Sequence, residues 1–336
     1  MTQNTETFLL NQLSKPGFHG GDQLGKTLGI SRVAVSKHMS SLRKKGLPLI
    51  SVAGKGYALE EGISLINKEH ITHFIDKNLH EKLVDIYIHQ QLDSTNAWLA
   101  EQDFTENRAA LCLTESQPAG RGRRDRQWHS SAYRNLMYSL SWRYSNWPAA
   151  LSSLSLLAGL ITAEALELCG VKQVKIKWPN DIYLDGKKLG GLLVSARGEA
   201  SGACDLVVGI GINHHILNEQ GRLIDQDWID LQSAGYSIDR NQLAALLTEG
   251  FIDLLPKFET QGFSPFTQAW NSRCLYKGDK VRLFKQSASK QSELKQDQAE
   301  IIGICMGVDK EGVLKIQDDK GLIIDIRDAD MSMRPI

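Results

Sequence analysis

Arginines alternate with glycines in the segment from Gln117 to Trp128, directly after an apolar run. The planar guanidinium group binds carboxylates and phosphates with two parallel hydrogen bonds, and glycine lets the backbone close over a ligand. These residue types in this order therefore fit a site where a carboxylate and a phosphate are brought together. A solvated basic loop or a nucleic-acid contact explains this segment equally well when it is taken alone.

A second segment of chemical interest is built around a predicted hairpin. Asp185 and Gly186 predict its tight turn, which returns Lys188 on a strand that lies beside Asn180 and Asp181. A lysine, an amide and a carboxylate would then converge on one spot. An ordinary surface hairpin is the alternative for this segment by itself.

The glycine spacing of the arginine segment does not predict a dinucleotide site. The template G-x-G-x-x-G fails at its last position, where Asp125 stands, and no strand, helix and strand follow in the order that the template needs. We therefore exclude a nicotinamide or flavin dinucleotide site there.

The composition excludes several classes of protein. Lys plus Arg and Asp plus Glu both total 39, with an isoelectric point near 7.1, so no overall charge marks the chain as a binder of polyanions. The 5 cysteines are scattered and form no C-x-x-C pair, which argues against a disulfide framework and against a zinc site. We expect no metal bound by protein ligands.

Two further features bear on the cellular location. The chain starts with polar residues that lack the pattern of an export signal. The most apolar stretch, Leu151 to Cys169, is interrupted by serines and glutamates, whereas a membrane span needs about 20 mostly apolar residues. We expect that stretch to be a buried core helix, and the protein to be cytoplasmic with no membrane partner.

Residues 1–62 predict a winged-helix DNA-binding domain. Residues 22–28 suit a short helix, Gly29 suits the left-handed turn that ends it, and Ser31 can cap a second helix that runs to Lys44. Strands at 49–52 and 57–59 would form the wing, with Lys55 at its glycine-rich tip.

The second helix has one apolar face and one polar face. Val35, Met39 and Leu42 fall on one side, at helical spacing, which leaves the other side free to enter a major groove. The predicted DNA-binding residues are Ser31, Arg32, Val33, Ser36, Lys37, Ser40, Arg43 and Lys55.

The rest of the chain predicts two more domains, so that the whole is a multidomain α+β protein. Residues 68–273 alternate strands and helices as in a mixed α/β domain, with strands at 83–89, 109–114, 136–143, 174–177, 189–197 and 206–212 and helices at 96–101, 151–169, 240–258 and 265–272. Residues 274–336 contain short strands at 280–284, 299–306, 313–317 and 322–326. We expect this tail to form a small β-barrel.

Taken together, these motifs resemble those of the biotin protein ligases. The family's G-R-G-R-R-x-R-x-W loop appears as Gly120 to Trp128 and its K-W-P-N-D segment as Lys177 to Asp181. Two further signatures match Asp93 to Asn96 and Gly209 to Asn213. With the winged helix, nearly the whole chain resembles the bifunctional biotin ligases and biotin operon repressors of bacteria. Asp125 departs from the family, which has a small residue there, usually glycine.

The resemblance implies a central ligase domain of the class II synthetase and biotin ligase type and an SH3-like C-terminal barrel. It also implies residue roles. The catalytic residues would be Lys188, Arg121 and Arg123. The biotin site would consist of Ser94, Thr95, Asn96, Gln117, Gly120, Arg121, Gly122, Arg123, Lys188, Gly209 and Gly211. The nucleotide site would consist of Arg123, Arg126, Trp128, Asn180, Asp181, Asn213 and Trp228.

Several of these residues have a simpler structural explanation. Ser94 or Thr95 alone would be a helix N-cap, glycine in a strand is commonly a β-bulge, and Trp128 and Trp228 could be ordinary packing anchors. The residue pattern itself leaves these alternatives open.

The activity that the resemblance implies has two steps. Biotin and ATP, with Mg²⁺, would give biotinyl-5′-adenylate, and a lysine of a biotin carboxyl carrier protein, such as that of acetyl-CoA carboxylase, would then take the biotin. The adenylate would also favour a homodimer that binds the operator DNA of the biotin operon. A lipoate ligase, a repressor with a weakened ligase site and a pure ligase with a vestigial winged helix are the alternatives.

Overall fold

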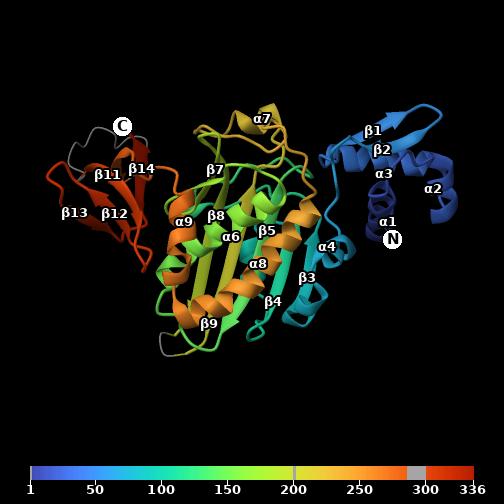
Figure 1. Cartoon of the computed structure of the whole chain (residues 1–336). Helices are drawn as coiled ribbons and strands as arrows, with labels where there is room; N and C mark the ends of the chain where they lie inside the picture. The colour runs from blue at the N-terminus through green and yellow to red at the C-terminus, as the bar shows by residue number, and fades with distance from the viewer. Residues whose placement is uncertain (1, 200–201, 286–299) are drawn as a thin grey trace.

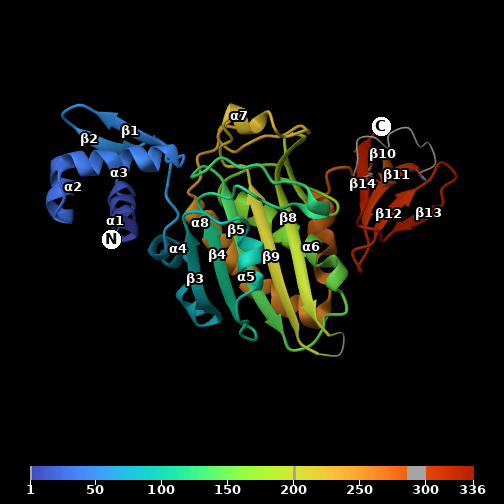
Figure 2. The ribbon, with the colours of Figure 1, turned by 180° about the vertical axis from the view of Figure 1, so that it is seen from behind.

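The protein consists of three regions arranged in a row, as the computed structural model shows (Figure 1). The structure describes residues 2–199, 202–285 and 300–336. The N-terminal helices and the C-terminal strands lie at opposite ends of a central twisted sheet, and the view from behind shows the same order (Figure 2).

The N-terminal region has the predicted helix and wing arrangement. Its elements are α1 (Thr2–Leu13), α2 (Gly21–Leu28), α3 (Arg32–Lys44), β1 (Leu49–Val52) and β2 (Gly56–Leu59). Gly29 ends α2 with a φ of 67°, and the Ser31 side chain caps α3 by accepting a hydrogen bond from the backbone N–H of Ala34. Val35, Met39 and Leu42 are buried on the inner face of α3. These expectations are confirmed, whereas α1 was not predicted.

The central sheet has seven strands in the order β3-β4-β5-β9-β8-β7-β6. The strands are β3 (Leu83–His89), β4 (Ala109–Thr114), β5 (Leu136–Tyr144), β6 (Lys175–Lys177), β7 (Asp181–Leu184), β8 (Lys187–Gly198) and β9 (Cys204–Ile212). Only the β3 and β4 pair is parallel; the other neighbours are antiparallel. The strand positions expected from the apolar runs are confirmed, and β7 is the strand that the predicted hairpin requires.

Helices cover the two faces of this sheet unequally. One face carries α6 (Leu154–Leu168) and α8 (Arg240–Gln261), which pack on each other and bury most of the apolar core. The other face carries the short helix α5 (Thr95–Ala100), which lies over β4, β5 and β9 (Figure 2). The remaining helices are α4 (Lys68–Phe74), α7 (Asn218–Gly221) and α9 (Thr267–Arg273).

The apolar stretch around α6 is a core helix, as expected. Residues Leu151–Leu168 are long and apolar enough to cross a membrane by length and composition, and they are the one such helix in the described residues. Eleven residues of α6 are buried in the core, which accounts for the apolar composition without a membrane.

The C-terminal region is a five-stranded antiparallel sheet in the order β13-β12-β11-β10-β14. Its strands are β10 (Lys280–Lys285), β11 (Ile301–Val308), β12 (Leu314–Gln317), β13 (Ile323–Ile326) and β14 (Met331–Pro335). Four strands were expected, and β14 was missed. Ala299, where the β11 prediction began, lies outside the described residues. β13 and β14 are the two edges of the described sheet, so the SH3-like barrel stays a prediction.

Candidate functional site

We call residues 117–128 the arginine loop. A cavity of about 980 Å³ lies between this loop, the surface of β8 and β9, and strand β14. Fifteen of the seventeen side chains or glycines predicted for biotin, nucleotide or catalysis line it: Ser94, Thr95, Gln117, Arg121, Gly122, Arg123, Arg126, Trp128, Asn180, Asp181, Lys188, Gly209, Gly211, Asn213 and Trp228. These residues come from segments more than 130 positions apart in the chain. The fold therefore brings the predicted site residues together.

Two predicted residues, Asn96 and Gly120, do not line the cavity. The amide of Asn96 donates to the Leu193 carbonyl at 3.3 Å and accepts from the Ser195 hydroxyl at 3.2 Å, so it braces α5 against β8. Gly120 is a point of close approach, since a Cβ there would lie 2.6 Å from the Trp128 carbonyl oxygen. In the structure, Asn96 and Gly120 hold elements beside the cavity in place without lining it.

The arginine loop closes mainly on itself. The Gly122 N–H donates to the Arg126 carbonyl at 2.7 Å, and the Trp128 N–H donates to the Gly120 carbonyl at 2.8 Å. Arg124 adopts a φ of 57°, in the left-handed region. A side-chain contact ties the loop to the opposite wall, where Nη1 of Arg123 donates to Oδ1 of Asn180 at 3.4 Å.

The opposite wall is the β7–β8 hairpin, and the predicted convergence is confirmed. Asp185 and Gly186 have φ values of 50° and 72°, as a two-residue turn of the mirror-image type requires. Nζ of Lys188 lies 2.8 Å from Oδ1 of Asp181, and the Asn180 amide donates to the Leu192 carbonyl at 2.8 Å. Lys188 is thus held on the sheet with its ammonium group at the cavity wall.

The floor of the cavity is flat because β8 and β9 carry glycine there. A Cβ on Gly211 would lie 2.6 Å from Cε2 of Trp128, so the indole ring rests directly on the backbone. The same ring lies 3.4 Å from the position a Cβ would take on Gly191. Nε1 of Trp128 is buried without a hydrogen-bond partner among the described residues. A buried indole N–H without a partner is uncommon, so this one calls for a partner that the described residues do not supply.

Polar groups gather at the N-terminus of α5. Ser94 caps the helix by accepting from the Ala97 N–H at 3.2 Å, which is the structural role that the sequence left open. The Thr95 N–H donates to Oε1 of Gln117 at 3.1 Å, and the Thr95 hydroxyl lies 2.8 Å from that of Ser139. Ser94, Thr95 and Gln117 nevertheless all line the cavity. Neutral donors and acceptors therefore mark this end of the cavity.

Asn213 and Trp228 line the cavity while holding its rim in place. The Asn213 amide donates to the Ile229 carbonyl at 3.2 Å, which fixes the segment after Trp228. The indole N–H of Trp228 donates to the Gly221 carbonyl at 3.2 Å, and the indole ring covers Gly221. The indole of Trp228 therefore acts as a packing anchor in addition to lining the cavity.

Lys177 was part of a recognised motif but was given no role, and the structure places it in the cavity wall. Its Nζ lies 3.2 Å from the Tyr183 hydroxyl and over the rings of Tyr183 and Tyr276. Burial lowers the pKa of Lys177 to about 8, despite the opposing effect of Asp181. The Lys177 ammonium group therefore loses its proton near pH 8.

The C-terminal sheet closes one side of the cavity, which the sequence did not predict. Its lining residues are Phe284, Lys285, Ala329, Met331, Ser332, Met333 and Arg334. The carboxylate of Asp330 accepts from Nη2 of Arg123 at 3.3 Å and from Nε of Arg124 at 3.1 Å. These contacts join residues more than 200 positions apart, so no local pattern could have revealed them.

The cavity is strongly cationic. Eight Lys and Arg residues of the described chain line it, against two aspartates, Asp181 and Asp225. The eight are Arg121, Arg123, Arg124, Arg126, Lys177, Lys188, Lys285 and Arg334. The side chain of Asp125 lies outside the described part of the structure. Lys188 pairs with Asp181 and Arg123 with Asp330, and repulsion among the cations that line the cavity favours bound anions.

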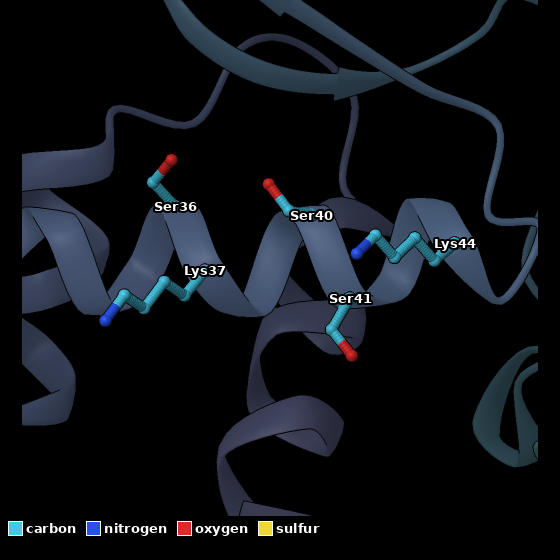
Figure 3. Close-up of a pocket in the computed structure, with 5 residues that line it drawn as sticks. All are labelled: Ser36, Lys37, Ser40, Ser41 and Lys44. Atoms are coloured by element: carbon cyan, nitrogen blue, oxygen red, sulfur yellow. The ribbon is translucent and has the colours of Figure 1, made fainter.

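A second candidate surface lies on α3. A shallow hollow there is lined by Ser36, Lys37, Ser40, Ser41 and Lys44, which project from successive turns of the helix (Figure 3). Ser41 and Lys44 were not among the predicted residues. Arg43 is exposed, but its guanidinium group donates to the Leu49 carbonyl at 3.1 Å. The surface is basic and hydroxyl-rich, as a helix that meets a DNA backbone is.

Comparisons with known proteins agree in both regions. A family model described as "Biotin/lipoate A/B protein ligase family" matches residues 87–213, and one described as "HTH domain" matches residues 5–58. The chain is 37% identical over 335 residues to the bifunctional ligase/repressor BirA of Escherichia coli (strain K12), with 99% of each chain covered.

Two further relatives extend the comparison. The chain is 31% identical to the biotin–[acetyl-CoA-carboxylase] ligase of Paracoccus denitrificans, over 68% of this chain and 92% of that one. A solved structure, the biotin protein ligase from Aquifex aeolicus in complex with biotin and ATP, matches with a TM-score of 0.58 and 27% identity. That match covers 76% of this chain and 100% of the other.

Proposed function

The chain belongs to the bifunctional biotin protein ligase and repressor family, and we propose how it works: it makes biotinyl-5′-adenylate, passes the biotin to a carrier protein and uses the adenylate to control operator binding. It is a biotin protein ligase with a helix-turn-helix repressor domain, and its substrates are biotin and ATP. The proposed domain limits are 1–62, 68–273 and 274–336.

The observation that carries the mechanism is the cationic cavity with two separately built walls. Lys188 approaches from the β7–β8 hairpin, and Arg121 and Arg123 approach from the arginine loop. A carboxylate and a triphosphate repel each other, and fixed cations on both sides offset that repulsion and orient the reacting atoms. This arrangement supports adenylate formation better than it supports simple binding of a neutral ligand.

In the first step, an oxygen of the biotin carboxylate attacks the α-phosphorus of ATP. A carbon–oxygen–phosphorus link forms, the bond from the α-phosphorus to the bridging oxygen breaks, and pyrophosphate leaves with the electron pair. Lys188 and the arginines stabilise the negative charge of this transition state, so no covalent intermediate with the protein is needed. Mg²⁺ would enter with ATP as part of the substrate.

In the second step, the amine of a carrier lysine attacks the carbonyl carbon of the mixed anhydride. An amide forms, the attacking nitrogen gives up one proton to water, and AMP leaves with the electrons of the broken carbon–oxygen bond. The acceptor we propose is the biotin carboxyl carrier domain of a biotin-dependent carboxylase. The support is that the Paracoccus denitrificans relative is a biotin–[acetyl-CoA-carboxylase] ligase. The carrier lysine must reach the cavity that the arginine loop, the β7–β8 hairpin and the C-terminal sheet line.

The neutral end of the cavity would hold the ureido head of biotin. Ser94, Thr95 and Gln117 offer hydroxyl and amide groups there, and the glycine floor at Gly209 and Gly211 admits a flat ring system. A site that must pair a substrate's polar groups rejects analogues that lack them. We therefore expect discrimination against lipoate, whose dithiolane has no N–H or carbonyl group.

The adenine end would lie near Trp128 and Trp228, with Arg126, Asn180, Asp181 and Asn213 around the ribose and phosphates. The support is the partnerless indole N–H of Trp128 and its position on Gly211. Arg123 would contact both substrates, because its side chain extends from the loop across the cavity to Asn180.

The regulatory part of the proposal is that the adenylate orders the arginine loop and thereby favours a homodimer. Two winged helices in such a dimer would meet successive major grooves of a two-fold operator, that of the biotin operon. Lys37, Lys44 and Lys55 would neutralise phosphates at the protein surface. Cytoplasmic residence follows from this role, because the operator is there.

The experiment that tests the function measures pyrophosphate release and operator binding with the same protein. Biotin plus ATP and Mg²⁺ should release pyrophosphate, lipoate should not, and operator affinity should rise when biotin and ATP are both present. Release with lipoate in preference to biotin would make the chain a lipoate ligase. No release with either, together with ligand-dependent operator binding, would leave a repressor without ligase activity.

A further inference from the structure

The junction between the DNA-binding region and the ligase domain contains a tyrosine with an unusual backbone. Tyr133 belongs to the segment that follows the arginine loop, yet its side chain is 2% exposed and packs in the core of the N-terminal region. That core also contains Leu9, Leu10 and Met39. A side chain of the ligase domain is therefore part of the hydrophobic core of the DNA-binding region.

The backbone of Tyr133 is held in an unfavourable conformation. Its φ is +62°, in the left-handed region that bulky side chains rarely adopt. Such a conformation persists only where the surroundings hold it, and it is found at ligand clamps and switches. The hydroxyl donates to Oε1 of Gln90 at 3.2 Å, and the N–H donates to the Glu115 carbonyl at 2.7 Å.

Two more contacts surround the inserted ring. Arg134, the next residue, forms a short ion pair with Glu60, and only 9% of its side chain is exposed. On the other side, the Cβ of Ala132 lies 3.0 Å from the position a Cβ would take on Gly46, at the turn after α3. Three successive residues of the ligase domain thus contact the DNA-binding region. We call residues 132–134 the latch.

Only a few residues along the chain separate the latch and its contacts from residues that line the ligand cavity. Trp128, which rests on the cavity floor, precedes Tyr133 by only five residues. Glu115, whose carbonyl binds the Tyr133 N–H, precedes the cavity residue Gln117 by two. The Glu115 carboxylate accepts the Ile66 N–H of the interdomain linker at 2.7 Å. One buried residue therefore touches the latch, the linker and the start of the arginine loop.

The start of α8 fixes the same linker. Nη1 of Arg240 donates to Oε2 of Glu115 at 2.8 Å, and its Nε donates to the Ser64 carbonyl at 3.2 Å. The Asn241 amide donates to the Leu65 carbonyl at 3.0 Å and accepts the Asn67 N–H at 2.8 Å. These bonds anchor the linker to the ligase domain, and the latch is a second contact between the ligase domain and the DNA-binding region.

We propose that the latch, with Tyr133 at its centre, couples occupancy of the ligand cavity to the docking of the DNA-binding region within a single chain. This inference rests on the proposed function, because the adenylate is the ligand that would order the arginine loop. Ordering that loop removes conformational freedom from the adjoining residues, so the cost of holding Tyr133 in its left-handed conformation falls. Ligand binding then strengthens docking before any dimer forms.

The test is hydrogen exchange of the full-length chain, at concentrations where size-exclusion chromatography shows a monomer. With biotin, ATP and Mg²⁺, the backbone amides of the loop at 117–128 should gain protection from exchange. The backbone amides of α1 and α3 should also gain protection, by about tenfold, which is a common size for coupling between sites. In Tyr133→Gly, the loop should gain the same protection, while the gain in α1 and α3 should fall below about twofold. Glycine adopts the required φ without strain, so the variant keeps its local backbone.

Two control variants separate coupling from general loosening. Tyr133→Phe keeps the inserted ring and loses only the bond to Gln90, so it should retain the coupled protection. Gln173→Gly removes another left-handed non-glycine residue, with a φ of 59°, from an exposed loop away from the junction. It should also behave like the unaltered chain.

The possible outcomes are distinct. A full ligand-dependent gain in α1 and α3 of Tyr133→Gly would overturn the latch proposal, as would protection of the loop alone in the unaltered chain. If biotin and ATP neither protect the loop nor release pyrophosphate, the proposed function is wrong and the latch proposal falls with it. Loss of coupling only in Tyr133→Gly supports the latch.

Discussion

The hairpin around Lys188 and the loop around Arg123 both face the cavity, but they are anchored in different ways. The hairpin belongs to a ladder of strands, and the backbone of Lys188 is paired on both sides, with Tyr183 and with the Trp228 segment. The loop forms backbone bonds mainly within itself and touches the other wall through side chains. The hairpin is therefore preorganised for chemistry, and the loop is free to respond to ligand.

This difference predicts different consequences for changes in the two walls. A change at Lys188 should alter the chemical step, because the position of that charge does not depend on the ligand. A change that disturbs the docking of the loop should mainly alter how tightly the adenylate is retained.

Lys188→Ala should reduce biotin-dependent pyrophosphate release by on the order of a hundredfold to a thousandfold, as loss of one preorganised electrostatic partner does. Chemically prepared biotinyl-adenylate, added to the same variant with a carrier domain, should still be used with a much smaller loss. Normal pyrophosphate release would remove Lys188 from the mechanism and with it the contrast between the walls.

Gly211→Ala should weaken retention of the adenylate by about tenfold, because the added methyl group overlaps the Trp128 ring and displaces the end of the loop. The measurement is the dissociation rate of labelled adenylate. Gly20→Ala, where a Cβ meets nothing within 4 Å, is the matched control and should leave the rate unchanged. An unaltered rate in Gly211→Ala would mean that loop docking does not depend on this floor.

The lowered pKa of Lys177 predicts that kcat/KM for ATP depends on pH. Its pKa is lowered to about 8, so the side chain is a cation below that pH and neutral above it. The kcat/KM for ATP should therefore fall by up to about tenfold from about pH 7 to about pH 9, as the charge that attracts phosphate is lost. In Lys177→Met this fall should be absent and the value low throughout. A variant with the same pH profile as the unaltered chain would assign the titration to another group.

The same shift has a consequence for stability. The unfolded chain holds the Lys177 proton up to its usual pKa of 10.5, so between about 8 and 10.5 the unfolded state binds more protons. This group's contribution to stability therefore increases with pH over that window. The contribution has its lowest value below pH 8, where the charged lysine is buried.

Asp125→Gly should have the smallest effect. A carboxylate in the arginine loop opposes phosphate unless it points away from it, so its removal should preserve adenylation to within about twofold or tighten adenylate binding. Adenylate formation and adenylate dissociation measure the two possibilities. A large loss of adenylation would show that the loop needs this aspartate.

Most of the fold could be predicted from local patterns. Strands such as β4 and β9 are apolar runs bounded by turn residues, and α3 is marked at both ends by Ser31 and by its basic last turn. The strand β14 was missed because Met331–Pro335 is short, contains no β-branched or aromatic residue and ends in proline. The helix α1 was missed because its polar sequence offers only three buried leucines.

The site was predictable where motif and chemistry coincide, and not where packing decides. The hairpin turn at Asp185 and Gly186 gave the position of Lys188 directly. Asn96 stays a predicted biotin residue, and its amide bonds to β8 from a helix only six residues long, which the sequence pattern did not reveal. The closure of the cavity by Arg334 and its neighbours depends on how two distant sheets meet, which no local spacing encodes.

The central claim is that cations on two separately anchored walls allow two repelling anions to react. The direct measurement is single-turnover adenylate formation, at saturating biotin and MgATP, in Lys188→Gln, Arg121→Gln and the double variant, beside binding of biotinamide, which has no carboxylate. Each substitution should slow adenylate formation by about a hundredfold or more, while biotinamide binding is retained. Unchanged rates in both single variants, or an equal loss of biotinamide binding, would contradict it.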